Sequence, residues 1–166
     1  MNDAGGAIYL KSSKLAANNI NITDSKATFG GAITALSSTV SLDALSAENN
    51  VASYDGGAVY QMYGTITIIN SNFTENSAVN GGALFIDNTT NMVQYQNKFV
   101  NNSANYTGGA IYSLLNKKSR INLNEYYDNT AQEENDLYET STMSLVFGDG
   151  NYIMYKNNST FSGVLP

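Results

Sequence analysis

Two carboxylates of this sequence are candidates for acid–base chemistry, because they recur at the same position of a repeated motif. Glu75 and Asp128 occupy the same position of a repeated motif, two repeats apart, and Asn49 and Asn101 fill that position in other repeats. Hydrolysis of a glycosidic bond needs two carboxyl groups that flank the bond at a defined separation. A carbohydrate-active enzyme, either a polysaccharide hydrolase or a lyase, is therefore the alternative function, although solvated turn residues are the simpler interpretation of this pair.

Other catalytic chemistries lack their usual residues. The 166-residue chain contains no His and no Cys, so it has no imidazole to activate a nucleophile and no common ligand for zinc, haem or an iron–sulfur cluster. A polysaccharide lyase would need a base beside acidic residues, and Arg120, Lys117 and Lys118 have no acidic column nearby. We therefore expect no enzyme activity, no metal site and no cofactor.

One aromatic position recurs directly after an aliphatic position. We expect the aliphatic side chains to point into the core as one column. Alternation along a strand then turns the aromatic residue outward, about 4.8 Å from its counterparts in the neighbouring strands. An exposed aromatic column is typical of a surface that binds sugar or protein. The alternatives are that the column only packs neighbouring coils together or that it faces inward. Thr34 interrupts the column, whose aromatic members are Tyr9, Tyr60, Phe85, Tyr112 and Tyr138.

Seven Asn-x-Ser/Thr sequons are candidate N-glycosylation sites. They matter only if the protein passes through a eukaryotic secretory route. In a chain with 24 Asn, this number of sequons can also arise by chance. The asparagines of the sequons are Asn21, Asn72, Asn88, Asn101, Asn105, Asn157 and Asn158.

Charge and hydropathy exclude two further classes of partner. The chain has 14 acidic and 8 basic residues and a net charge of −6, which argues against binding to the phosphate backbone of nucleic acid. No run of about 18 apolar residues is present, so the sequence predicts no transmembrane helix. The absence of Cys is compatible with either redox compartment.

An internal repeat dominates the sequence and sets the expected fold. The motif Gly-Gly-Ala-aliphatic occurs five times at intervals of 25 to 27 residues, and a sixth copy begins at Glu134 without its glycines. Between the copies run alternating stretches rich in β-branched residues, which indicate strands. About 26 residues with three short strands and three turns predict one coil of a parallel β-helix. The coils start near residues 5, 30, 56, 81, 108 and 134.

A second motif, aromatic-x-x-Asn, keeps phase with the first. Its aromatic residues, Phe73, Phe99 and Tyr126, are expected to stack inside the coil. Its asparagines fall at one turn of successive coils, where Asn tolerates a left-handed backbone and its amide can bond the coils above and below. We predict a structural Asn ladder formed by Asn50, Asn76, Asn102 and Asn129.

These repeats predict an all-β protein, a right-handed single-stranded parallel β-helix (solenoid) of about six coils of 25–27 residues. The handedness follows from the general rule for parallel crossovers. Residues 1–138 are expected to contain the repeats, and residues 139–166, where the Gly-Gly pairs are missing, a degenerate terminal coil or cap-like segment. Because the end of such a rod exposes unpaired strand edges, we expect neighbouring coils or subunits to stack end to end.

The two phased motifs, Gly-Gly-Ala-(Ile/Leu/Val) and Phe-x-x-Asn, resemble the repeats of the chlamydial polymorphic membrane proteins, and similar repeats occur in surface proteins of protists. The resemblance covers about residues 5–138. It implies the β-helical passenger of an autotransporter, which is exposed on the cell surface and acts as an adhesin.

We therefore expect a non-enzymatic, extracellular segment of a surface protein or fibre, with a structural or adhesive role. The expected partners are a host-surface protein or a glycan, with no nucleic acid. Besides the carbohydrate-active enzyme, two alternatives stay open. One is a head-to-tail fibre-forming subunit, and the other is a spacer that binds no ligand.

Overall fold

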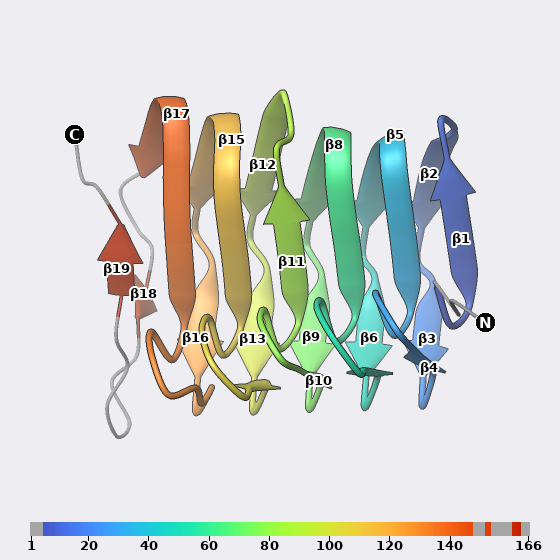
Figure 1. Ribbon diagram of the computed structural model, residues 1–166, viewed down its shortest axis with the longest axis horizontal. Coiled ribbons are helices and arrows are strands. Elements are labelled where there is room, and N and C mark those ends of the chain that lie inside the picture. Colours follow the sequence, from blue (N-terminus) through green and yellow to red (C-terminus); the bar gives the residue numbers. More distant parts are fainter. Residues whose placement is uncertain (1–4, 148–151, 154–160, 164–166) are drawn as a thin grey trace.

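The protein is an all-β parallel solenoid, as the repeats predict. The computed structural model describes residues 5–147, 152–153 and 161–163, with the side chains of residues 5–139, and winds through about five turns. None of the described residues is helical. Five turns start at the five Gly-Gly pairs, and the residues after Glu134 begin a sixth. The turns lie side by side along the rod (Figure 1).

Three parallel sheets form the walls of the solenoid. The long sheet has nine strands: β1 (Ile8–Lys11), β2 (Lys14–Asn18), β5 (Ile33–Asp43), β8 (Val59–Ile69), β11 (Leu84–Asp87), β12 (Asn91–Tyr95), β15 (Ile111–Asn122), β17 (Leu137–Phe147) and β19 (Phe161–Gly163). The second sheet has six: β3 (Asn21–Thr23), β6 (Ser46–Glu48), β9 (Asn72–Thr74), β13 (Lys98–Val100), β16 (Glu125–Tyr127) and β18 (Tyr152–Ile153). The third has four: β4 (Lys26–Ala27), β7 (Val51–Ala52), β10 (Ser77–Ala78) and β14 (Ser103–Ala104).

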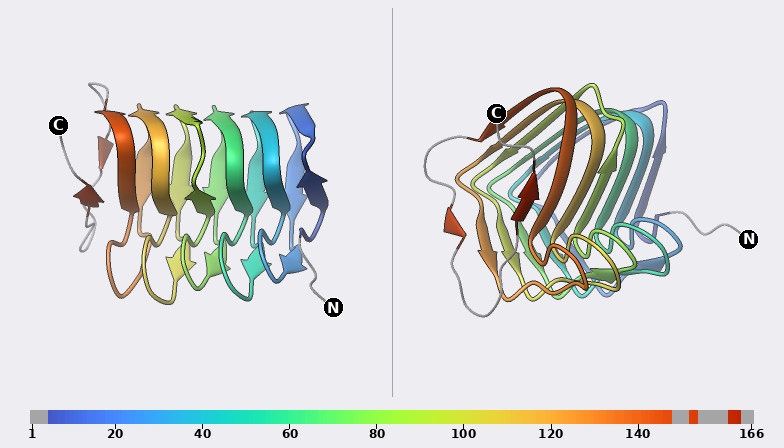
Figure 2. Two further views of the ribbon diagram at one scale, coloured as in Figure 1. Left: turned by 45° about the horizontal axis from the view of Figure 1, so that its top comes forward. Right: turned by 60° about the vertical axis from the view of Figure 1, so that its left-hand side comes forward.

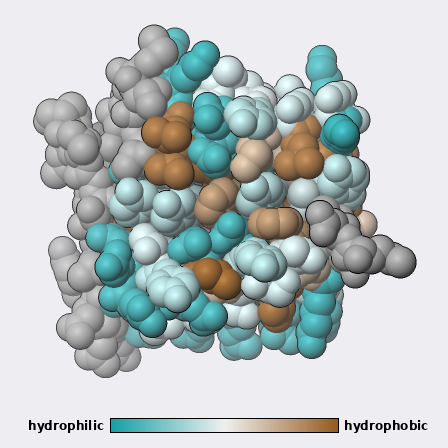
Figure 3. Space-filling view, in the orientation of Figure 1, coloured by the Kyte–Doolittle hydropathy of each residue, from teal (hydrophilic) through white to brown (hydrophobic). Residues whose placement is uncertain are grey.

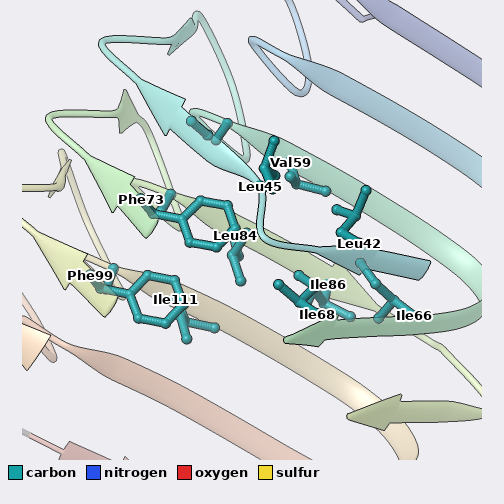
Figure 4. Packing of buried hydrophobic residues seen from close by; sticks show 14 of the residues in the cluster. Leu42, Leu45, Val59, Ile66, Ile68, Phe73, Leu84, Ile86, Phe99 and Ile111 are labelled. Atoms are coloured by element: carbon teal, nitrogen blue, oxygen red, sulfur yellow. The ribbon is translucent and has the colours of Figure 1, made fainter. Parts of the chain in front are cut away.

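Equivalent residues of successive turns pair in register, so like side chains stack in the core. The aliphatic residue of each Gly-Gly-Ala motif points inward in one column, as the sequence predicts: Ile8, Ile33, Val59, Leu84, Ile111 and Leu137. Phe73, Phe99 and Tyr126 form a second interior stack with centroid separations of 5.0 and 5.2 Å. Figure 4 shows Phe73 and Phe99 in this core together with Leu84 and Ile111.

The path of the chain agrees with the predicted handedness. In Figure 1, β1 and β11 run upward on the near side, β2 and β12 lie behind them, and the chain advances from right to left. A path that rises in front, crosses to the back and advances to the left is right-handed. The corner loops of successive turns lie one behind another (Figure 2).

The Gly-Gly corner needs its two glycines for different reasons. Gly81 has φ +61°, a left-handed conformation that side chains with a Cβ disfavour. A Cβ on Gly82 would lie 2.0 Å from the carbonyl oxygen of Gly109 and 2.6 Å from that of Ser103. The second glycine therefore lets the backbones of neighbouring turns approach each other.

The division predicted near residue 138 falls within an element. β17 starts at Leu137 and runs through Phe147, paired in parallel with β15. That pairing contains register shifts between Ser113 and Asn116 and between Asn116 and Lys118. The division of the chain at residue 138 stays a prediction.

Candidate functional site

The aromatic column lies on the outer face of the long sheet, and its four members from Tyr60 to Tyr138 form a continuous stack. Val59 and Gln61 are fully buried, so alternation along β8 places Tyr60 between them on the outer side. The ring centroids of Tyr60 and Phe85 are 5.1 Å apart, those of Phe85 and Tyr112 are 5.1 Å apart, and those of Tyr112 and Tyr138 are 4.8 Å apart. The rings are within 19° of parallel.

The expectation that the whole column is exposed is wrong at Tyr60 and Phe85. These side chains are only 7 and 8% exposed, whereas Tyr9 is 48% exposed and Tyr112 and Tyr138 are half-buried. The stacked rings cover one another's faces, and Phe29, from the preceding corner, packs on Tyr60 at 5.0 Å. The stack therefore offers ring edges and hydroxyl groups to a ligand, while its inner ring faces are already in contact with protein.

A second outward column runs beside the aromatic one. Leu36, Met62, Asp87 and Leu114 pair in register two residues after the aromatic positions. At the corner that follows, Tyr63 and Leu115 are 50 and 46% exposed. We define the aromatic face as these residues together with Thr34, Tyr60, Phe85, Tyr112 and Tyr138. Figure 3 shows this side of the molecule, where apolar residues are interspersed with polar ones.

Sequence reasoning missed the second column, although a signal for it exists. Leu36, Met62 and Leu114 recur at the repeat interval, two residues after the aromatic position, and so belong to the same face by alternation. Asp87 takes this position in β11 and interrupts the apolar pattern.

Two carboxylates give the aromatic face a negative potential. Burial raises the pKa of Asp55 and of Asp87, and the Asn80 amide donates a 2.9 Å hydrogen bond to Asp55 Oδ1. Burial, and then the charges of Asp55 and Asp87, raise the pKa of Tyr60 to about 12. Burial also raises the pKa of Tyr112, followed by Tyr138 and then by the same two carboxylates. Both phenols are therefore neutral hydroxyl groups at physiological pH.

The four predicted ladder asparagines lie in one hydrogen-bonded column. The side-chain amides of Asn50, Asn76 and Asn102 each donate to Oδ1 of the next asparagine at 3.0 Å. Each of these oxygens also accepts a backbone N–H from the preceding turn at 3.0 Å. The column ends where Asn129 Nδ2 donates to Asp136 Oδ1 at 3.0 Å. All four asparagines are buried.

Two further corners contain related columns that were not predicted. At the end of the long strands, the backbone N–H of Ser71 donates to Asn97 Oδ1, and that of Asn97 donates to Asn124 Oδ1. At the bend within the long strands, Thr89 donates to Asn116 Oδ1 through its backbone N–H and its hydroxyl. The 27-residue spacing of Asn97 and Asn124 was the available signal.

The candidate catalytic carboxylates do not share a site with the aromatic face. Glu75 and Asp128 are exposed at corners with φ +55° and +51°, two turns apart, which is roughly 10 Å at the usual strand spacing. Lys117, Lys118 and Arg120 are exposed on or beside the outer face of β15. Within the described residues, no group of three or more acidic side chains is arranged to hold a metal ion.

All five sequon asparagines within the described side chains are exposed, and they are Asn21, Asn72, Asn88, Asn101 and Asn105. The alternation of strands explains part of this. Asn72 and Thr74 lie on either side of the buried Phe73 in β9, so both sequon residues face outward. Asn157 and Asn158 lie outside the described residues.

Comparison with known protein families finds a similarity in one segment of the chain. Residues 98–114 match the Chlamydia polymorphic membrane protein (Chlamydia_PMP) repeat. No curated protein and no solved structure matches the chain. Since the described residues form strands and no helix, none of them belongs to a helix that could span a membrane. The matched segment runs from β13 through the Gly-Gly corner into β15, so one stretch of the solenoid, containing Tyr112 and Leu114 of the aromatic face, is similar to this repeat.

Proposed function

We propose that this chain is a non-enzymatic segment of an extracellular surface protein, and that the aromatic face makes its adhesive contacts. Similarity to a polymorphic membrane protein repeat supports a surface protein. The solenoid supports a rigid presentation of the face, because stacked core residues and Asn columns hold every turn in register.

The observation that carries the proposal is the pair of bulky residues at the corner beside the aromatic columns. Tyr63 and Leu115 have φ +59° and +53°, which bulky side chains adopt only at a cost in free energy. Ser12, Ser37 and Asn88 hold equivalent corners in other turns with φ between +50° and +56°. The repeat therefore does not need an exposed aromatic or aliphatic side chain there, and an intermolecular contact accounts for both.

The test measures attachment of cultured epithelial cells to surfaces coated with the 166-residue protein. The double variant Tyr63→Ser and Leu115→Ser restores the residue that other turns use, so it should fold as stably as the parent. We expect the parent protein to hold cells and the double variant to hold several-fold fewer. Tyr95→Ser is the matched control, because Tyr95 is 38% exposed on β12 and outside the aromatic face.

Two results would contradict the proposal. Coated surfaces that hold no more cells than uncoated ones would favour a spacer without a ligand. Attachment that is unchanged in the double variant but lost in Tyr95→Ser would place the contact on a different surface. Thermal melts of all the variants separate a lost contact from a lost fold.

A further inference from the structure

The aromatic face holds one carboxylate among apolar neighbours. Asp87 pairs with Met62 on one side and with Leu114 on the other, and Phe85 precedes it by two residues on the same face. Its Oδ1 atom is buried and has no hydrogen-bond partner in the described part of the chain. The side chain as a whole is only partly buried. A cationic donor that approaches from solvent can therefore pair with a carboxylate that the protein has already partly desolvated.

A second carboxylate lies near the same phenols. Asp55 and Asp87 both act electrostatically on Tyr60 and on Tyr112. Between Thr34 and Leu114, the two outward columns contain no Lys or Arg. The centre of the aromatic face therefore combines negative charge with apolar side chains.

This combination discriminates between classes of ligand. Phosphates and other anions would be repelled by the two carboxylates. A sugar that stacks on aromatic faces finds the inner rings already stacked on one another at about 5 Å. A Lys or Arg side chain meets both features, because its charged end can pair with a carboxylate while its aliphatic stem covers apolar surface.

We propose that the aromatic face binds a cationic, amphipathic segment of a partner protein, with a Lys or Arg side chain at Asp87 and apolar side chains on Met62 and Leu114. This inference rests on the proposed adhesive role of the face and specifies the chemistry of its partner.

The test uses fluorescence anisotropy with two labelled octapeptides, one alternating Leu and Arg and the other alternating Leu and Gln. We expect the Arg peptide to bind the 166-residue protein at least tenfold more tightly than the Gln peptide at low ionic strength. Asp87→Asn, which keeps the shape of the side chain, should remove most of that difference. Asp128→Asn changes the net charge equally at an exposed corner after β16 and should leave it intact.

Each outcome has one meaning. Equal binding of the two peptides to the parent protein, or an unchanged difference in Asp87→Asn, would overturn the inference. If both peptides bind equally and both are weakened by Tyr63→Ser with Leu115→Ser, the face is an apolar docking surface and the proposed function stands. An equal loss of preference in Asp128→Asn would show that net charge, and not Asp87, attracts the Arg peptide.

Discussion

At the scale of single residues, the buried asparagines form hydrogen bonds with backbone groups, which no apolar side chain can do. A corner in a solenoid interrupts the strand pairing and leaves backbone N–H and C=O groups without strand partners. The amide of Asn76 serves both kinds of group, since it donates to the carbonyl of Ala47 and accepts the N–H of Asn50. Because each asparagine also bonds the next one, the column ties consecutive turns together.

Asn76→Ala should lower the free energy of unfolding by about 3 kcal/mol, because several buried donors and acceptors lose their partners together. Urea unfolding measures the loss. Asn72→Ala, at an exposed position of β9, is the matched control and should change stability by no more than about 0.5 kcal/mol. Similar effects of the two substitutions would show that the column does not stabilise the fold.

A buried acid lies near the start of the sixth turn. Glu139 is 1% exposed, and neither carboxylate oxygen has a hydrogen-bond partner of good geometry in the described part of the chain. Burial raises its pKa to about 6, although the hydroxyls of Ser113 and Ser119 act in the opposite direction. Asp136 and Tyr126 are the other titratable groups buried nearby. The folded protein therefore holds the proton of Glu139 more tightly than the unfolded chain does.

This pKa makes stability depend on pH with a definite sign. Since the folded state binds this proton more tightly than the unfolded state, the protonated Glu139 adds to the free energy of unfolding. That addition is complete below pH 4.5 and is lost as the pH rises through about 6. The free energy of unfolding falls by about 2 kcal/mol over this pH range. Glu139→Gln should be more stable than the parent at pH 7 by a similar amount, as measured by urea unfolding between pH 4 and pH 8. Glu75→Gln, at an exposed corner, should retain the parent's dependence, and parallel curves for the parent and Glu139→Gln would contradict the assignment.

At the scale of the elements, the Gly-Gly corner sets the geometry of each turn. It joins the third sheet to the long sheet through a residue in the left-handed region, which is a glycine in five turns. In the next turn Glu134 takes this position with φ +47°. The backbone conformation thus persists where the residue that favours it has been lost, because pairing with the preceding turn imposes it: Gly109 N–H donates to the Glu134 carbonyl at 3.1 Å.

Glu134→Gly should therefore raise the free energy of unfolding by about 1 kcal/mol, since glycine adopts this conformation without the Cβ penalty. Thermal unfolding followed by circular dichroism measures the shift. Glu133→Gly, one residue earlier at a position without positive φ, should lower stability instead, because glycine only adds freedom to the unfolded chain. A loss of stability in Glu134→Gly would show that the glutamate makes a contact worth more than the backbone strain.

At the scale of the whole molecule, the interior changes character along the rod. The middle turns are filled by aliphatic and aromatic side chains such as Ile33, Leu84 and Phe73. Later interior positions include Ser113, Asn116 and Ser119, all fully buried. The aromatic face spans these turns on the outside of the rod. The polarity of the interior therefore changes from turn to turn beneath a surface that all of these turns share.

Repetition is what the sequence by itself determined. Five Gly-Gly-Ala motifs at nearly equal intervals predicted parallel turns, their starting points and the inward aliphatic column. Such inferences succeed because each turn must repeat its neighbour's backbone for strands to pair in register, so a recurring residue occupies a recurring place. The asparagines were placed in one corner by the same reasoning.

Only the tertiary structure decided how much of each outward side chain meets solvent. Alternation correctly turned Tyr60 and Phe85 outward, yet both are buried, because stacked rings from adjacent turns and Phe29 from a neighbouring corner cover them. The pairing of Asp87 with Met62 and Leu114 likewise depends on the register between turns. Direction is a property of a single strand, whereas exposure and charge environment are created by the neighbours that the fold brings together.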